Sequence, residues 1–294
     1  MAEKSIPVDL TNPGQVFACL GFLEAADVLL GEARGGFDWR DAADLRFRLA
    51  ARGDDDPVVR VLRFLDEARV TSVAPVESPH NTNKWKIETT KDGSGAFPFR
   101  DTGPDVLPAR LSDGSGKSIA MDHWGDQGRT GRDRMKFWAG AGGYPGAGLA
   151  RDALDLIRGR AAGHACDPFS LSAEQSSSFR FDWRRDYVPI DAGFSPNAHD
   201  DMVMRGYPVV ELLAAIGLTN ARPVRRQRLE YSYGVAGMGG DELYDPIFLR
   251  AALGLAKPLF PGMPFRLFAM RLDWPGQEGQ ARCITDVIEE TPLP

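Results

Sequence analysis

The chain has 294 residues, of which 43% are hydrophobic, and its formal net charge is −6. This composition excludes a disordered chain and provides enough apolar surface for one large domain or two modest ones. Because a protein that coats nucleic acid non-specifically is usually basic overall, any nucleic-acid contact here must come from a local patch.

The cysteines and the first residues bear on the cellular compartment. Cys19, Cys166 and Cys283 lie far apart and form no CxxC pair, which fits a reducing cytosol and argues against a cysteine-rich zinc site. Glu3 and Lys4 interrupt the start of the chain, so no signal peptide is expected. No window approaches the roughly 18 apolar residues of a membrane span. We therefore expect a cytoplasmic protein that makes no contact with a membrane.

The N-terminal quarter of the chain predicts two helices and three strands. Thr11 or Asn12 can cap a helix at about residues 14–30, and Pro13 would be its first residue. Few charges interrupt this helix, so we expect it to be central and mostly buried. The other expected elements are strands at 6–10, 37–39 and 44–50 and an amphipathic helix at 57–68.

The middle of the chain is rich in strand and turn signals. Residues 84–90 alternate between apolar and polar side chains, which predicts a strand. Residues 107–111 and 119–124 flank an Asp-Gly-Ser-Gly sequence at 113–116, which predicts a hairpin. The other expected features here are an exposed loop at 125–134 and a helix at about 147–162.

Residues 176–196 begin with alternating aromatic and charged side chains, which predicts a strand leading into a polar loop that ends at Asn197. The two expected faces are Phe179, Phe181 and Trp183, and Arg180, Asp182 and Arg184. Two interpretations are open. The strand could be a nucleic-acid platform, or an ordinary edge strand with aromatic side chains in the core and Arg–Asp pairs in water.

The remaining elements complete a mixed pattern without a strict βαβ rhythm. They are helices at 209–218 and 246–256 and strands at 229–235, 265–274 and 282–288. The fold class is therefore expected to be α+β, with mixed, mostly antiparallel sheets, several packed helices and long ordered loops. We expect a single composite domain over residues 1–294, with a possible break between lobes near residues 164–177.

Residues 114–118, Gly-Ser-Gly-Lys-Ser, have the composition of a phosphate-binding loop. The full pattern needs a glycine at position 111, where this chain has leucine. It also needs a helix after the lysine, where this chain predicts a strand. A turn that exposes Lys117 is the better interpretation.

The four histidines show no HxH, HxxxH or HExxH spacing. Two clusters could still supply carboxylate oxygens and imidazole to a metal: Asp122 and His123 with Asp126, and His199 with Asp200 and Asp201. Surface turns and helix caps explain both clusters more simply. The sequence therefore predicts no catalytic residue, no metal and no cofactor.

Three arginine-rich patches are interleaved with aromatic side chains, the combination that single-stranded nucleic acid requires. They comprise Arg129, Arg132, Arg134 and Lys136; Arg180, Arg184 and Arg185; and Arg222, Arg225, Arg226 and Arg228. Each patch alone could be a solvated face. In an acidic chain, their combination predicts a nucleic-acid interface, to which we also assign Lys117 and Asn197.

Four stretches together resemble a known family, the compact large-subunit-type protein of the U/G subtype of type I CRISPR effector (Cascade) complexes. They are residues 12–26 (NPGQVFACLGFLEAA), 184–197 (RRDYVPIDAGFSPN), 211–223 (ELLAAIGLTNARP) and, more weakly, 136–140 (KFWAG). The resemblance spans about residues 12–223, and its second and third stretches are the more specific.

The resemblance implies a non-catalytic subunit of an RNA-guided surveillance complex in antiviral defence. Such a subunit lies near the 5′ end of the guide RNA, helps to recognise the protospacer-adjacent motif in target DNA, contacts the other subunits and recruits a separate helicase-nuclease. Two alternatives remain open. One is a metal-dependent nuclease or hydrolase that uses Asp122, His123 and the cluster at residues 199–201. The other is a structural subunit that touches only protein.

Overall fold

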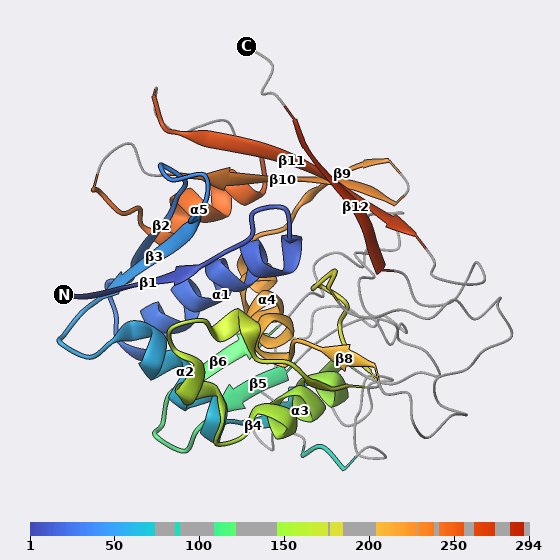
Figure 1. Ribbon diagram of the computed structural model, residues 1–294. Helices are drawn as coiled ribbons and strands as arrows, with labels where there is room; N and C mark the ends of the chain where they lie inside the picture. Colours follow the sequence, from blue (N-terminus) through green and yellow to red (C-terminus); the bar gives the residue numbers. More distant parts are fainter. Residues whose placement is uncertain are drawn as a thin grey trace, which may run out of the picture.

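The computed structural model describes residues 1–73, 86–88, 109–121, 146–175, 177–184, 204–227, 229–237, 241–255, 262–273 and 283–290. Within these residues the chain forms five α-helices and four small antiparallel sheets (Figure 1). The α+β class expected from the sequence is confirmed. No helix in these ranges combines the length and the apolar run that crossing a bilayer requires.

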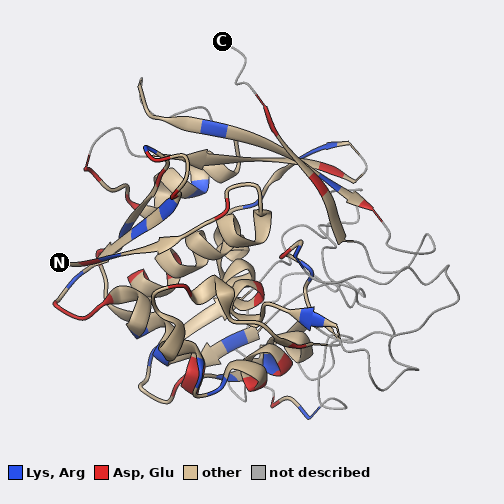
Figure 2. Ribbon diagram, in the orientation of Figure 1, with Lys and Arg blue, Asp and Glu red and all other residues tan. Residues whose placement is uncertain are grey.

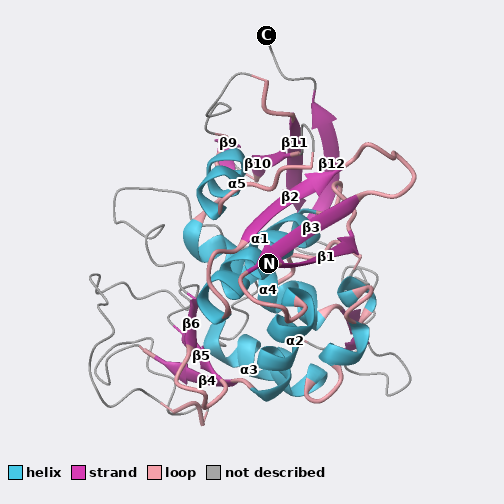
Figure 3. Ribbon diagram, turned by 90° about the vertical axis from the view of Figure 1, so that its left-hand side faces the viewer, coloured by secondary structure: helices cyan, strands magenta, loops and turns pink. Residues whose placement is uncertain are grey.

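Two apolar helices form the centre of the molecule, α1 (Pro13–Leu29) and α4 (Pro208–Asn220). Both begin at a proline, and Oδ1 of Asn12 caps α1 by accepting a 3.1 Å hydrogen bond from the Gly14 amide. The expected central helix is confirmed, since nearly every residue of both helices is buried. In two views at right angles, α1 and α4 lie between the four-stranded sheet and the sheet β4–β5–β6 (Figures 1 and 3).

The two central helices touch through their glycines. A Cβ atom built on Gly21 would lie 1.8 Å from the Leu213 carbonyl oxygen, and one on Gly217 would lie 2.3 Å from that of Phe17. Both separations are too short for any side chain. The missing side chains therefore allow the two backbones to meet.

A three-stranded sheet in the order β1–β3–β2 lies beside α1. Its strands are β1 (Ala2–Pro7), β2 (Arg34–Asp38) and β3 (Arg46–Ala51). The strand predicted at 44–50 is confirmed, the one at 37–39 begins earlier than predicted, and the one at 6–10 is shifted toward the N-terminus, with residues 6 and 7 in common. Helix α2 (Pro57–Glu67) follows, and Oδ1 of Asp56 caps it by accepting from the amides of Val58 and Val59. The sheet and α2 together form the N-terminal part of the core.

A second sheet contains the predicted hairpin. Its order is β4 (Arg69–Ser72), β5 (Ala109–Ser112) and β6 (Ser118–Met121), and α3 (Gly146–Ile157) packs beside β4. Gly114 and Gly116 in the hairpin turn have φ values of 85° and 88°, which favour glycine. Residues 86–88, the described part of the strand expected at 84–90, form no strand, and the Glu88 carbonyl accepts from the Ser72 amide instead.

The four-stranded sheet has the order β12–β11–β10–β9, with β9 (Val224–Gln227), β10 (Glu230–Ala236), β11 (Phe265–Asp273) and β12 (Cys283–Glu290). The predicted C-terminal strands are thus confirmed, and α5 (Pro246–Leu253) packs against β10. Tyr233 joins this sheet to the centre, because its hydroxyl donates to the Leu10 carbonyl at 2.8 Å and its ring lies between Phe17 and Phe268.

Short elements connect α3 to α4. They are the 3₁₀ turns η4 (Ala161–His164) and η5 (Pro168–Ser170) and the two-residue strands β7 (Ala173–Glu174) and β8 (Arg205–Gly206), which pair with each other. In the region where the sequence suggests a break between lobes, Phe169 and Leu171 are buried in the same apolar core as α1.

Candidate nucleic-acid interface

The prediction of a strand around residues 179–184 is wrong. Residues 177–184 form no strand, and Arg180 has a φ of 64°. This left-handed residue breaks the period-two alternation on which the prediction rests. Phe179 and Phe181 are buried as expected and stack on each other at 5.5 Å. Asp182, expected on the outer face with the arginines, is completely buried.

Asp182 is the centre of a polar network that we call the Asp182 cluster, formed by Asn12, Asp182, Arg184 and Glu211. Its Oδ1 accepts from Asn12 Nδ2 at 2.9 Å and from Arg184 Nε at 3.0 Å, and its Oδ2 accepts from Arg184 Nη2 at 2.6 Å. Oε1 of Glu211 accepts from the Phe181 and Asp182 amides, each at 3.1 Å. The cluster therefore connects the first turns of α1 and α4 to the segment at 177–184.

Close backbone packing reinforces this junction. A Cβ atom on Gly14 would lie 2.5 Å from the Phe181 carbonyl oxygen, so only glycine fits at this point of α1. Three of the stretches that carry the family resemblance thus meet at the Asp182 cluster, through Asn12, Arg184 and Glu211. The fourth stretch, residues 136–140, lies outside the described residues.

Arg184 is held by protein groups on several sides. Besides the carboxylate of Asp182, its Nη2 donates to the Phe169 carbonyl at 2.8 Å, and its guanidinium lies 3.6 Å from the centroid of the Tyr207 ring. Burial alone would lower the pKa of Arg184, but the hydrogen bonds and charge of Asp182 outweigh it, so the pKa lies above its usual value. In this structure Arg184 acts as a structural cation.

Other candidate cations in the described residues are also bonded to protein acceptors. Lys117 Nζ donates to the carbonyl of Leu29, the last residue of α1, where a cation also complements the helix dipole. Arg226 on β9 makes a bidentate pair with Glu290 on β12, linking the two edge strands of the sheet. Nε of Arg225 donates to the Gln227 carbonyl at 3.1 Å.

Arg180 lies near the start of β12. Its charge acts to lower the pKa of the Cys283 thiol, although burial has the larger effect and raises that pKa to about 11. Across the described elements, basic and acidic residues are interspersed and are not separated into two faces (Figure 2).

Several sequence candidates lie outside the described residues. They are Arg129, Arg132, Arg134, Lys136, Arg185, Asn197 and Arg228, together with the alternative metal candidates Asp122, His123, His199, Asp200 and Asp201. Among the residues that the structure does describe, no group of three or more His, Cys, Asp or Glu side chains could hold a metal ion.

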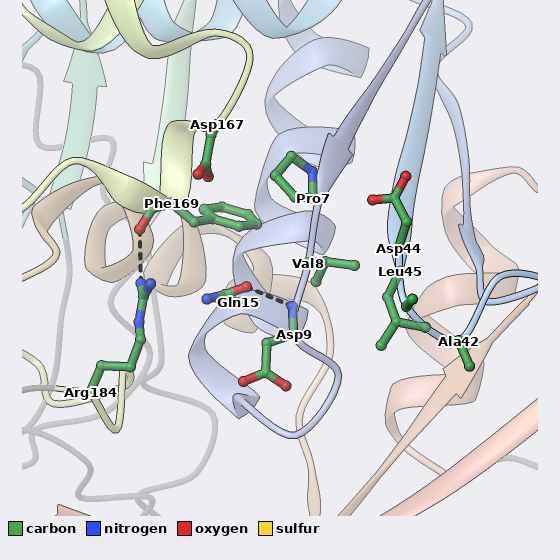
Figure 4. A pocket seen from close by; sticks show the side chains of 11 residues that line it. Pro7, Val8, Asp9, Gln15, Ala42, Asp44, Leu45, Asp167, Phe169 and Arg184 are labelled. Atoms are coloured by element: carbon green, nitrogen blue, oxygen red, sulfur yellow. Dashed lines mark hydrogen bonds between the residues drawn. The ribbon is translucent and has the colours of Figure 1, made fainter.

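A pocket of about 390 Å³ opens beside Arg184 (Figure 4). Its lining consists of Pro7, Val8, Asp9, Gln15, Ala42, Ala43, Asp44, Leu45, Asp167, Phe169 and Arg184. Sequence reasoning missed this site because its residues come from separate parts of the chain. One available signal was Gln15, a polar residue in the first turn of a mostly apolar helix.

Comparisons of this chain with protein-family models, with curated proteins and with solved structures found no match.

Proposed function

We propose that this chain is a non-catalytic subunit of a type I CRISPR RNA-guided surveillance complex. In that role it contacts the 5′ end of the guide RNA and the target DNA beside the protospacer. The observation that supports the proposal best is the meeting of three resemblance stretches at the Asp182 cluster. Residues far apart in the sequence form one structural unit there, as expected if they belong to the architecture of one family.

The described residues on both sides of the segment that carries Arg185 and Asn197 contact each other. Arg184 precedes the segment, Tyr207 follows it, and the two side chains stack at 3.6 Å. The Met204 carbonyl accepts from the Gln175 amide at 2.8 Å, next to the pairing of β7 with β8. The described residues on both sides of this segment are therefore joined to each other and to the central helices.

We assign most of the nucleic-acid contact to the candidate cations that have few acidic neighbours in the sequence. The stretch from Arg129 to Lys136 contains four cations and one acidic residue, Asp133. Such an excess attracts phosphates, whereas the guanidinium of Arg184 already has its counter-charge. Arg184 stays bonded to Asp182, while Arg185 and Asn197 would contribute beside it, with Arg180, Arg225, Arg226 and Lys117 as supporting contacts.

The proposal includes partners and a compartment. The chain would act in the cytoplasm, bind the other subunits of the complex, and recruit a helicase-nuclease that performs the cleavage. No cofactor is required for this role. The chain would contribute to recognition of nucleic acid, so substitutions in it should change target binding and assembly of the complex.

Photo-crosslinking of the reconstituted complex tests the proposal. The chain is assembled with the other subunits and a guide RNA that carries a photoreactive base near its 5′ end, with and without target DNA. We expect the chain to crosslink to both nucleic acids, and Arg185→Ala to reduce the yield. The control Arg52→Ala removes an exposed arginine paired with Glu32 and should leave the yield unchanged.

Two results would overturn this assignment. Normal assembly without any crosslink to RNA or DNA would identify a structural subunit that touches only protein. Cleavage of DNA or RNA by the isolated chain with magnesium or manganese would instead identify a metal-dependent nuclease.

A further inference from the structure

The pocket beside Arg184 is lined by a largely buried glutamine, Gln15, whose amide nitrogen is accessible from the pocket. Gln15 is 5% exposed, and its Oε1 accepts a 2.8 Å hydrogen bond from the Asp9 amide. Because a backbone amide can only donate, this bond fixes the oxygen toward Asp9 and leaves the nitrogen directed toward the Arg184 side of the pocket (Figure 4). Within the described residues Nε2 has no acceptor.

Arg184 offers a second donor beside Gln15. Its Nε and Nη2 are occupied by Asp182 and the Phe169 carbonyl, but Nη1 has no acceptor within the described residues. An accessible amide donor beside a guanidinium donor presents two N–H groups to whatever enters the pocket. The inner wall of the pocket is therefore suited to a carbonyl oxygen.

The rim of the pocket is acidic. Oδ1 of Asp9 accepts from the amide and the hydroxyl of Thr11, and within the described residues neither Asp9 nor Asp167 has an ion-pair partner. Asp44 also lines the rim but is paired with Arg46 at 3.3 Å. Arg184 is paired with Asp182 and its charge compensates Asp167 only in part, so the acidic residues of the pocket exceed its one cation. This balance repels phosphate and attracts a cation.

We infer that this pocket binds a basic segment of another protein. A lysine or arginine side chain of that segment pairs with Asp9 and Asp167, while a backbone carbonyl of the same segment accepts from Gln15 Nε2 and Arg184 Nη1. The volume of about 390 Å³ suits one side chain with its adjacent peptide group. Pro7, Val8 and Leu45 provide apolar surface for the methylene groups of that side chain.

This inference is independent of the proposed nucleic-acid role, because the charge of the pocket selects a different class of ligand. A nucleic-acid strand would bring phosphates toward Asp9 and Asp167 at an electrostatic cost. A basic protein segment satisfies the donors and the carboxylates together. The interaction can accordingly be measured with the isolated chain.

N-acetyl-arginine N-methylamide serves as the probe, because it carries a guanidinium and two peptide carbonyls. The side-chain amide signals of Gln15 are followed in a ¹H–¹⁵N spectrum and assigned from their loss in Gln15→Met. We expect a saturable shift with the arginine compound. The corresponding citrulline compound, which has the same shape without the charge, should produce no saturable shift at the same concentrations.

The matched variants separate the effect of charges in the pocket on binding from the effect of the net charge of the protein. Asp9→Asn with Asp167→Asn should weaken binding of the arginine compound by about fivefold or more, the range for two partly exposed charge pairs. Asp54→Asn with Asp55→Asn makes the same charge change at exposed residues and should leave the affinity unchanged. Equal binding of the citrulline compound, equal affinities of the two double variants, or a Gln15 response only to a single-stranded oligonucleotide would overturn the inference.

Discussion

Asp182 is a fully buried carboxylate that connects residues far apart in the chain. It accepts from Asn12, 170 positions away, and from the guanidinium of Arg184. A buried charge is tolerated when such partners surround it, and removing one partner leaves the other uncompensated. At this position, therefore, one side chain controls both the local conformation of residues 177–184 and their attachment to α1.

Replacing Asp182 by alanine should destabilise the protein strongly. We expect the free energy of unfolding to fall by about 3–5 kcal/mol, the usual cost of breaking a buried pair. Urea denaturation measures the change. The control is Asp241→Ala, because Asp241 is 90% exposed and pairs with Arg40 and Arg48 at 3.6 Å. That substitution should change stability by less than about 0.5 kcal/mol, and equal losses in the two variants would contradict the assigned role of Asp182.

The three thiols should differ in reactivity. Burial raises the pKa of Cys19 well above its usual value and that of Cys283 to about 11, while Cys166 is exposed. Because the thiolate is the reactive form, one thiol should be labelled rapidly by iodoacetamide at pH 8 and the other two only after unfolding. Mass spectrometry counts the labels, with Cys166→Ser as the control that loses the rapid one. Rapid labelling of Cys19 in the folded protein would show that α1 is not buried.

The core depends on the close contact between helices α1 and α4. Gly21 lies against the Leu213 carbonyl, and Gly217 lies against that of Phe17. Each helix contains an aliphatic residue followed by glycine, Leu20-Gly21 in α1 and Ile216-Gly217 in α4. This similarity between the two sequences is too weak to indicate an internal repeat. In the fold the two glycines are the contact points of the two helices, and so their role is packing.

Gly21→Ala tests this crossing. Alanine favours a helix by about 1 kcal/mol over glycine, yet here its Cβ would overlap backbone, so we expect a net loss of about 1–3 kcal/mol. Gly163→Ala is the matched control, since a Cβ atom at this position would have no neighbour within 4 Å and the φ of Gly163 is negative. It should be neutral or slightly stabilising in thermal denaturation. A stabilising effect of Gly21→Ala would contradict the close approach of the helices.

The elements that were predicted correctly have local causes. Asn12 and Pro13 mark the start of α1, and the Asp-Gly-Ser-Gly turn at residues 113–116 marks the hairpin of β5 and β6. The error at residues 179–184 has a tertiary cause. The amides of Phe181 and Asp182 bond to Glu211, about 30 positions away, and not to a neighbouring strand.

The candidate interface was less predictable for a similar reason. Arginines that form patches in sequence find acceptors from distant parts of the fold, such as Glu290 for Arg226 and the Leu29 carbonyl for Lys117. Neither partner is close in sequence. A cluster of cations thus predicts local charge, but the fold decides which of those charges remain for a ligand.

At the scale of the whole molecule, ion pairs should make stability depend on pH. A hydrogen bond from Arg266 lowers the pKa of Glu289, and one from Arg40 lowers the pKa of Asp38. A carboxyl group whose pKa is lower in the folded state stabilises the protein above its ordinary pKa of about 4. That contribution is lost as the pH falls through the depressed pKa.

The melting temperature should therefore be steady between about pH 7 and 5 and fall progressively below about pH 4. Differential scanning calorimetry at several pH values measures this. Arg266→Ala should reduce the acid-induced decrease, because Glu289 then returns toward its ordinary pKa. A melting temperature that stays constant or rises between about pH 5 and 3 would contradict the assigned pairing.

The salt dependence of target binding tests the proposed function most directly. The assembled complex is titrated with target DNA at several salt concentrations, with alanine at Arg129, Arg132, Arg134 and Lys136. The control complex carries alanine at Arg34, Arg52, Arg63 and Arg69, which are exposed, so the net charge changes equally. Each duplex phosphate contact contributes about 0.9 to the slope of log affinity against log salt.

We expect the first variant to weaken binding and to flatten that slope by about two to four units, while the control keeps the slope of the unmodified complex. Such a result would place phosphate contacts at this stretch of the chain. Identical affinities and slopes in both variants, with equal subunit composition, would contradict the nucleic-acid interface and leave these cations as a solvated surface.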